Sequence, residues 1–304
     1  MSGGGATAGG ASDGEAAGAK LIDGKAEAAA VRAEVAADVE SRVAAGARKP
    51  GLATILVGDD PASAVYVARK IREAGEVGMN SEHHALPADV SMQELLAVIE
   101  DCNRDEGIDG IIVQLPLPAQ LDEDAAVAAV DPTKDVDGLH PVNQGALFTG
   151  RPGPRPCTPV SCVHLMDTTG VDLAGLHAVV VGRSALVGKP VSMLLLERHA
   201  TVVLCHSRTA DLQRQVESAD VLVVAIGSPR AIPGEWVKPG SVVIDVGINR
   251  VDGRLVGDID FDVARQRAAY ITPVPGGVGP MTVAVLLRNT RDAWLASLAA
   301  ESAA

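Results

Sequence analysis

Three polar residues are spaced so that they could perform acid–base chemistry. Tyr66 and Lys70 lie four residues apart in a segment, 63–73, with the composition of a helix, so their side chains share one face. Gln114 lies at the carboxyl end of an apolar run, 109–115, that predicts a buried strand. Open α/β sheets bind their ligands at this end of their strands. A lysine at such a spacing is more commonly a solvated surface charge, so the site depends on how the fold surrounds it.

Two acidic residues occupy a turn sequence. Asp135 and Asp137 flank Val136 in the segment 134–138, which ends in glycine. Aspartate often caps a turn, because its carboxylate accepts hydrogen bonds from nearby backbone N–H groups. On spacing alone, turn capping is the simplest interpretation of both residues.

A turn with two glycines joins a predicted strand to a predicted helix. The apolar run 178–181 leads into Gly182, and Gly188 precedes a helical segment that continues to Arg198. A helix N-terminus offers free N–H groups and a partial positive charge to a phosphate. The segment therefore indicates a dinucleotide site. Its sequence departs from G-x-G-x-x-G, so an ordinary strand–helix turn remains the alternative.

The end of the next predicted strand, 201–205, indicates which dinucleotide binds. An NAD enzyme carries an acidic residue near this point for the ribose hydroxyls. This chain has His206, Ser207 and Arg208 there, and Arg183 lies nearby in the first turn. Hydrogen-bond donors and positive charge suit the 2′-phosphate of NADP. Because Arg208 alone could be a surface charge, Arg183 and Ser207 carry more of the prediction.

Predicted strands and helices alternate along most of the chain. Strands are expected at 52–57, 109–115, 178–181, 201–205, 221–226 and 241–246. Helices are expected at 26–45, 63–73, 122–130, 161–169 and 282–300, with another that begins at the capping box of Ser91 and Glu94. The alternation predicts an α/β fold, in which helices cover both faces of parallel sheets.

Proline and glycine become frequent between 131 and 158, which predicts a domain boundary. We expect a flexible Gly/Ala-rich tail over 1–19 and a first α/β domain over 20–157. A second, Rossmann-like dinucleotide-binding domain is expected over 158–281. The final helical segment, 282–304, is expected to return to the first domain.

Composition excludes several classes of protein. Apolar residues make up 47% of the 304 residues, too many for a wholly disordered chain. The net charge of −13 and the pI of about 4.9 argue against nucleic-acid and anionic-membrane partners. No apolar run approaches the roughly 20 residues that span a bilayer, and the start of the chain lacks the pattern of a signal peptide. The four cysteines lack zinc-ligand spacing, so we expect buried thiols, no metal and a cytoplasmic location.

Six ordered motifs resemble the bifunctional methylenetetrahydrofolate dehydrogenase/cyclohydrolase family. They are SAVYVARK at 63–70, VQLPLP at 113–118, KDVDG at 134–138, PCTP at 156–159, GRS with VGKP at 182–184 and 187–190, and PVPGGVGPMT at 273–282. The resemblance covers roughly 21–300. It implies oxidation of 5,10-methylenetetrahydrofolate by NADP, followed by hydrolysis of the methenyl product to 10-formyltetrahydrofolate. The first domain and the returning helix would bind folate and carry out catalysis, and the second would bind NADP.

The resemblance also implies roles for single residues. Lys70 would be the central acid/base group, which requires surroundings that favour a neutral amine, because only a neutral amine accepts a proton. Gln114 would hydrogen-bond Lys70, and Tyr66 would pack on the folate ring. Asp137 would accept hydrogen bonds from the pterin, and the loop 275–277 would cover the junction of folate and nicotinamide.

The predicted sites fall into three sets, and the family is usually homodimeric. The catalytic set is Tyr66, Lys70 and Gln114. The substrate-binding set is Tyr66, Val113, Gln114, Leu115, Asp137, Pro275, Gly276 and Gly277. The cofactor-binding set is Gly182, Arg183, Ser184, Val187, Gly188, Pro190, His206, Ser207, Ile248 and Thr282.

Three other functions compete with this prediction. A relative with one activity would lack either the Lys70–Gln114 pair or the Gly182 loop with Ser207, and both are present. A non-catalytic NADP-binding regulator would lack the set of Tyr66, Lys70 and Gln114. A dehydrogenase of amino acids with a Rossmann domain would leave Asp137 and the 275–280 motif without a purpose.

Overall fold

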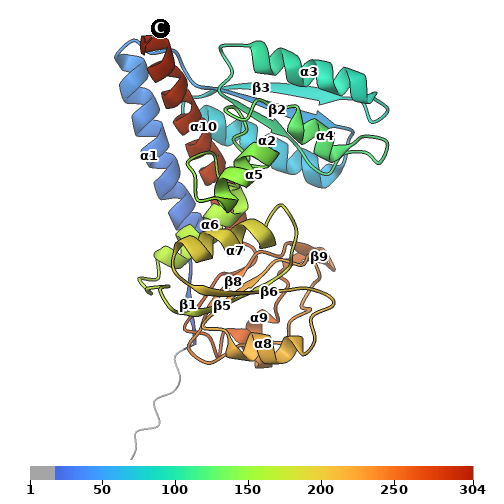
Figure 1. The fold of residues 1–304 in the computed structure, drawn as a ribbon, viewed down its shortest axis with the longest axis vertical. Helices are drawn as coiled ribbons and strands as arrows, with labels where there is room; N and C mark the ends of the chain where they lie inside the picture. The colour runs from blue at the N-terminus through green and yellow to red at the C-terminus, as the bar shows by residue number, and fades with distance from the viewer. Residues whose placement is uncertain (1–17, 304) are drawn as a thin grey trace, which may run out of the picture.

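The computed structural model describes residues 18–303, which form two α/β parts joined by long helices (Figure 1). One part is built on a three-stranded sheet and the other on a six-stranded sheet. Every strand pair within these two sheets is parallel. Parallel neighbours need crossover connections, which the intervening helices provide. The predicted α/β fold is confirmed.

The smaller sheet has the strand order β3-β2-β4. Its central strand β2 (Gly51–Val57) and its edge strand β4 (Gly110–Val113) are buried along their whole length, as their apolar sequences predict. The other edge strand, β3 (Asn80–Leu86), is mostly exposed and polar, and the sequence did not reveal it. The helices of this part are α2 (Pro61–Glu76), α3 (Met92–Arg104) and α4 (Glu123–Ala128).

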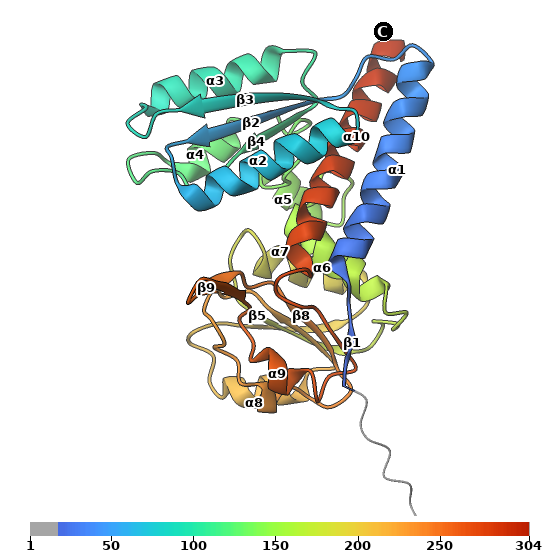
Figure 2. The same cartoon turned by 180° about the vertical axis from the view of Figure 1, so that it is seen from behind.

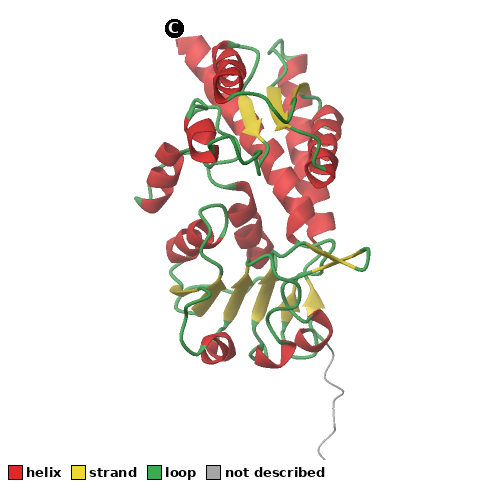
Figure 3. Cartoon of the chain, turned by 90° about the vertical axis from the view of Figure 1, so that its right-hand side faces the viewer, coloured by secondary structure: helices red, strands yellow, loops and turns green. Residues whose placement is uncertain are grey.

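The larger sheet has the strand order β1-β11-β8-β7-β5-β6. Its strands are β1 (Lys20–Leu21), β5 (His177–Val181), β6 (Thr201–Cys205), β7 (Val221–Val224), β8 (Val242–Asp245) and β11 (Tyr270–Ile271). The helices α7 (Gly188–Glu197), α8 (Leu212–Ser218), α9 (Phe261–Ala264) and the 3-10 turn Gly234–Trp236 cover it, so helices lie on both faces (Figure 3). A hairpin of β9 (Asn249–Val251) and β10 (Arg254–Val256) projects beyond it.

Long helices connect the two parts. Helix α1 (Gly24–Ala44) packs against α10 (Val278–Ala303), and α10 also packs against α6 (Cys157–Asp167). Between the two parts, α5 (Pro141–Phe148) contacts α7. Helix α10 begins beside the larger sheet and runs along the smaller part (Figure 2), where Trp294 is fully buried. The final helix therefore returns to the first part of the molecule, as predicted.

Three boundaries differ from those predicted. The segment 1–19 was expected to be a flexible tail, but its last residue, Ala19, is part of the folded structure. Ala19 is buried in a core cluster of the larger part, and its N–H donates to Arg265 O at 2.7 Å. The rest of that segment, 1–17, lies outside the described residues. Lys20 and Leu21 pair with β11, so they belong to the larger sheet and not to the first part. Helix α10 begins at Val278, four residues before the predicted start at 282, because proline is tolerated in the first turn of a helix.

A buried carboxylate ties α10 to the smaller sheet. Asp109 accepts both guanidinium nitrogens of Arg48 at 2.7 Å, the N–H of Gly51 at 2.9 Å and the hydroxyl of Ser297 at 2.9 Å. Its side chain is 1% exposed, whereas that of Arg48 is 29% exposed. One side chain thus fixes the start of β2, the start of β4 and the second half of α10.

Asp109→Ala is expected to lower the free energy of unfolding by on the order of 3 kcal/mol. The substitution leaves the N–H of Gly51 buried without its acceptor, and leaves the Arg48 charge with the exposed Glu301, 3.4 Å away, in place of a buried carboxylate. Urea unfolding followed by circular dichroism measures the change. Asp101→Ala, at an exposed position of α3, is the control and is expected to shift stability by about 0.5 kcal/mol or less. Equal losses in both variants would contradict the anchoring role of Asp109.

Two kinds of feature are absent from the described residues, membrane-spanning helices and clusters of metal ligands. Within 18–303, no helix is both long and apolar enough to cross a membrane. In the same range, no cluster of three His, Cys, Asp or Glu side chains is arranged to hold a metal ion. The cysteines Cys102, Cys157, Cys162 and Cys205 are all buried free thiols.

Candidate active site between the two parts

A pocket between the two parts unites residues that are distant in the sequence. It has a volume of about 160 Å³ and is lined by Tyr66 and Arg69 of α2, by Ile248 after β8 and by the segment 273–280. The predicted residues Pro275, Gly276 and Gly277 lie in that segment. The first part and the larger sheet therefore meet at this pocket.

The predicted acid/base pair is in hydrogen-bond contact. Lys70 is buried, with 8% of its surface exposed, and its Nζ donates to Gln114 Oε1 at 3.0 Å. Gln114 Nε2 donates in turn to its neighbour's carbonyl, Leu115 O, at 2.7 Å, which fixes the amide with its oxygen toward the lysine. An amide acceptor carries no net charge, so it orients the amine without the pull that a carboxylate would exert on an ammonium.

Tyr66 is half-buried one turn before Lys70 on the same face of α2. Burial raises the pKa of its hydroxyl, and the nearby charge of Arg69 opposes that change. Glu73 holds Arg69 through Nε at 2.7 Å, which keeps this arginine on the helix surface. Tyr66 is therefore a protonated phenol at neutral pH, with an apolar ring facing the pocket and a hydroxyl able to donate.

The turn that carries Asp137 is built on a buried carboxylate. Asp135 accepts the N–H groups of Gly138, Leu139 and His140 at 3.0, 3.1 and 2.8 Å, and the amide of Asn143 at 2.8 Å. Burial raises the pKa of Asp135, while these hydrogen bonds lower it. Asp135 is thus the capping residue of the turn, and the neighbouring Asp137 is left half-buried.

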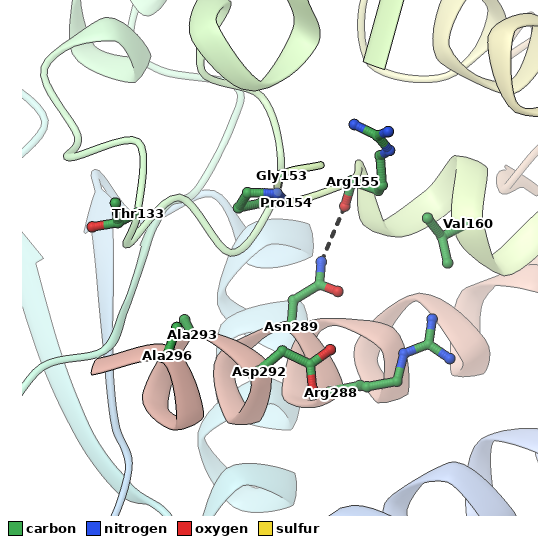
Figure 4. Close-up of a pocket in the computed structure, with 10 residues that line it drawn as sticks. All are labelled: Thr133, Gly153, Pro154, Arg155, Val160, Arg288, Asn289, Asp292, Ala293 and Ala296. Atoms are coloured by element: carbon green, nitrogen blue, oxygen red, sulfur yellow. Dashed lines mark hydrogen bonds between the residues drawn. The ribbon is translucent and has the colours of Figure 1, made fainter. Parts of the chain in front are cut away.

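Helix α10 supports the turn that carries Asp137. Asn289 Nδ2 donates to Val136 O at 2.9 Å and to Arg155 O at 3.0 Å. Figure 4 shows Asn289 among the residues that line a second pocket of about 530 Å³, beside Arg288 and Asp292 and with its side chain directed at Arg155. The sequence did not indicate Asn289, because its helix position carries no motif beyond apolar periodicity.

A buried thiol lies beneath the predicted folate site. Cys157 Sγ donates to Val136 O at 3.2 Å, and its pKa is raised well above the usual value by burial and by the charge of Asp137, against the opposing charge of Lys70. The N–H of Cys157 also donates to Asp137 O at 3.4 Å, so this thiol lies beside the turn that carries Asp137. Composition indicated only a buried thiol, although the PCTP motif contained the residue.

Gly182 is required by the close approach of two loops at the larger sheet. Its φ is +123°, and a Cβ built there would lie 2.1 Å from Ala225 O. Its N–H donates to Cys205 O at 2.9 Å. The loops after β5, β6 and β7 therefore converge at this glycine. The strand order reverses at β5, and this is the point where such sheets bind nucleotides.

The start of α7 differs from the expectation of free N–H groups. Ser184 Oγ accepts the N–H of Val187 at 3.1 Å and that of Gly188 at 3.5 Å, and Ser184 O accepts that of Lys189 at 3.1 Å. Ser184 occupies these donors because its side chain can reach the turn that follows it. A phosphate at this helix start would compete with the Ser184 contacts.

Polar side chains at the carboxyl ends of β5 and β6 are exposed to solvent. Arg183 and Ser207 are exposed, and His206 is half-buried, with its Nδ1 accepting the N–H of Arg208 at 3.1 Å. No acidic side chain occurs between the end of β6 and Asp211, which caps α8. The donors and the positive charge predicted for a 2′-phosphate therefore lie at one edge of the sheet.

The remaining predicted site residues lie in different surroundings. The side chains of Val113 and Pro190 are buried within the protein, so neither presents a free side chain to a ligand. Leu115 lines a separate pocket of about 500 Å³ with Ala185 and Leu186 of the larger part. Thr282 Oγ1 lies 3.3 Å from Thr158 Oγ1 and donates to Val278 O at 3.2 Å.

Comparisons with known proteins agree with this arrangement. A family model described as "Tetrahydrofolate dehydrogenase/cyclohydrolase, catalytic domain" matches residues 22–137. Another, the "NAD(P)-binding domain" of the same description, matches 156–298. The bifunctional protein FolD of Halothermothrix orenii is 55% identical over 273 residues, which are 89% of this chain and 96% of that protein. FolD of Sorangium cellulosum is 56% identical over 283 residues, or 92% and 99% of the two chains.

Solved structures show the same similarity. The bifunctional FolD methylenetetrahydrofolate dehydrogenase/cyclohydrolase of Campylobacter jejuni has a TM-score of 0.89 at 42% identity, and covers 91% of this chain and 99% of that one. The enzyme of Trypanosoma brucei, complexed with NADP and an inhibitor, has a TM-score of 0.89 at 42% identity, with 92% and 99% covered. The chain belongs to the tetrahydrofolate dehydrogenase/cyclohydrolase family.

Proposed function

We propose that this enzyme oxidises 5,10-methylenetetrahydrofolate to the methenyl compound with NADP, and then hydrolyses that product to 10-formyltetrahydrofolate. The observation that carries the proposal is the contact of buried Lys70 with Gln114, on the helix face that presents Tyr66 to the pocket shared by both parts. A single pocket can then hold the reacting carbon for both steps. The product would supply formyl groups for one-carbon metabolism, including purine biosynthesis.

The residues at the edge of the larger sheet fit NADP. Gly182 lets the loops after β5, β6 and β7 converge, and Arg183 and Ser207 offer charge and a donor where an NAD enzyme has an acid. When bound, NADP accepts the hydride from the methylene carbon. We assign the cofactor site to Gly182, Arg183, Ser184, Val187, Gly188, Pro190, His206, Ser207, Ile248 and Thr282.

We assign the folate site to the first part, with α10 as its support. Asp137 would accept hydrogen bonds from the pterin amide and amino groups, and the ring of Tyr66 would stack on the substrate. Lys70 would take a proton from the water that adds to the methenyl carbon and return one as the ring opens. Gln114 would hold the amine of Lys70 in the direction of that carbon. The complete substrate set is Tyr66, Val113, Gln114, Leu115, Asp137, Pro275, Gly276 and Gly277.

One two-stage assay tests both activities. The purified enzyme is mixed with methylenetetrahydrofolate and either NADP or NAD, and the reduced cofactor is followed first. The decay of methenyl absorbance is then followed in the same sample. We expect faster reduction of NADP than of NAD and enzyme-dependent decay of the methenyl compound. Absence of either stage would reduce the proposal to a single activity.

Arg183→Ala is expected to weaken NADP binding far more than NAD binding. The variant removes a charge-assisted contact worth about 1.5–3 kcal/mol, which only the 2′-phosphate of NADP would make. Because Arg183 is exposed and lacks a structural partner among the ion pairs of residues 18–303, folding is expected to be unaffected. Kinetics with both cofactors measure the effect, and Arg250→Ala on the exposed hairpin serves as control. Equal weakening of NADP and NAD would mean that the 2′-phosphate is recognised elsewhere.

We further propose a cytoplasmic homodimer that binds neither nucleic acid nor membranes. The four buried free thiols suit a reducing compartment, and the net charge of −13 disfavours anionic polymers and lipids. Exposed apolar side chains on the projecting hairpin, Val251 and Leu255, favour contact with a second subunit. Sedimentation equilibrium of the purified enzyme measures its assembly.

A further inference from the structure

Two buried carboxylates interlock at the carboxyl ends of β7 and β8. Asp245, 2% exposed, accepts the N–H groups of Gly247 and Asp258 at 3.0 and 2.9 Å through Oδ1, and that of Ile259 at 3.0 Å through Oδ2. Burial raises the pKa of Asp245 to about 7, although these hydrogen bonds lower it. The backbone of Asp258 is thereby fixed by the side chain of Asp245.

The side chain of Asp258 gathers a second set of donors. Asp258 is fully buried, and it accepts the successive N–H groups of Ile226, Gly227 and Ser228 at 2.7, 2.9 and 2.9 Å. It also accepts Asn249 Nδ2 at 2.8 Å. One carboxylate therefore sets the path of the loop after β7 and the base of the hairpin that follows β8.

The glycines around these carboxylates leave no room for a side chain. A Cβ built at Gly257 would lie 1.9 Å from Asp245 Oδ2, and one built at Gly247 would lie 2.2 Å from Asp258 Oδ1. Asp258 therefore packs on the backbone of Gly247, whose N–H donates to Asp245, and Asp245 packs on Gly257, the neighbour of Asp258. Contacts this close hold the two loops in one geometry.

Both loops border the proposed cofactor site. The loop after β7 begins at Ala225, whose carbonyl packs on Gly182 where the three loops converge. Ile248 lies between Gly247, held by Asp245, and Asn249, held by Asp258, and its exposed side chain lines the pocket that contains Tyr66. Asp245 lines the same pocket from the larger part, and the hydrogen bonds of the two carboxylates described above are all made to residues of the larger part.

We propose that Asp258, anchored by Asp245, is a positioning residue for the dinucleotide. It fixes the loop after β7 and the segment around Ile248, and the cofactor lies against both. This inference rests on the proposed NADP-dependent function. It predicts a division of labour within the enzyme. Loss of Asp258 impairs hydride transfer through cofactor affinity, and leaves intact the hydrolysis of the methenyl compound, which needs no cofactor.

Asp258→Asn tests the proposal in the intact enzyme. The amide keeps the shape of the carboxylate but turns an N–H₂ group toward backbone N–H donors, so two of the four contacts are lost. We expect the KM and Kd for NADP to rise about tenfold or more, with kcat changed less than about threefold. Hydrolysis of the methenyl compound is expected to stay within about twofold. Asp252→Asn, at the exposed turn of the same hairpin, is the control and is expected to match the wild type.

The outcomes separate a positioning role from a structural one. A rise in the KM for NADP with unchanged hydrolysis supports the proposal. Equal losses of both activities, or an unchanged KM for NADP, would overturn it. If Asp258→Asn does not fold, Asn249→Ala carries the test, because it removes the contact at 2.8 Å and a longer one to Val256 O at 3.5 Å but keeps the Asp258 carboxylate, and it is expected to raise the KM for NADP with the same selectivity. A wild-type enzyme that cannot reduce NADP would instead refute the proposed function.

Discussion

Lys70→Met is expected to reduce hydrolysis of the methenyl compound by a factor of about 10² or more, the usual contribution of a positioned acid/base group. Methionine keeps the length and apolar stem of lysine but can neither take nor return a proton. Lys70 is buried and its Nζ donates to Gln114 Oε1 at 3.0 Å. The amide of Gln114 cannot replace the lysine as an acid or base. The dehydrogenase is expected to fall less, because hydride transfer needs no proton donor.

Decay of methenyl absorbance in the purified variant measures this effect. NADP binding, which depends on the larger part, verifies that the variant is folded. Lys49→Met, at an exposed position after α1, is the matched control and is expected to retain full hydrolysis. Near wild-type hydrolysis by a folded Lys70→Met enzyme would end the assignment of Lys70 as the acid/base group.

Asp137→Ala is expected to raise the Kd for folate about 10- to 100-fold, which corresponds to the loss of charge-assisted hydrogen bonds worth about 1.5–3 kcal/mol. The turn itself is expected to survive, because its backbone donors are satisfied by Asp135 rather than by Asp137. NADP affinity is expected to remain nearly unchanged, since Asp137 belongs to the first part.

Calorimetric titration with a folate ligand and with NADP separates the two expectations. Asp89→Ala, which removes an exposed carboxylate from the same part, controls for the change in net charge. Unchanged folate affinity in Asp137→Ala would end the assignment of this residue to the substrate site. Weakened NADP binding would instead point to a disturbance of the whole molecule.

The sequence predicted the elements whose local pattern matches their final environment. The strands β2, β4, β5, β7 and β8 are apolar and buried, so composition alone located them. The polar edge strand β3 has no such pattern, and its pairing with β2 over seven residues defines it. The hairpin β9–β10 does carry a local signal in the sequence, because Asp252 and Gly253 form its turn.

The candidate site likewise contains residues that the sequence predicts and residues that it does not. Lys70, Gln114 and Tyr66 could be named from spacing and resemblance, because each sits in a motif. The groups that hold the site in place, such as Asn289 behind the Asp137 turn and Asp258 beneath the loop after β7, act across 153 and 32 residues of sequence. Their roles exist only once the chain has folded, and no spacing rule connects them to the residues they support.

The return of α10 to the first part has a consequence for how the protein is made. The apolar face of α1, formed by Val31, Val35 and Val39, packs against a helix that begins only at Val278. On the ribosome, this face emerges early and lacks its partner until almost all of the described chain has been synthesised. The strands β5 to β8 can pair before that moment, whereas the face of the smaller sheet that packs on α10 stays uncovered until then. Translation therefore supplies the whole larger sheet before the smaller sheet receives its last helix, and a chain interrupted before α10 would present that apolar stripe to chaperones.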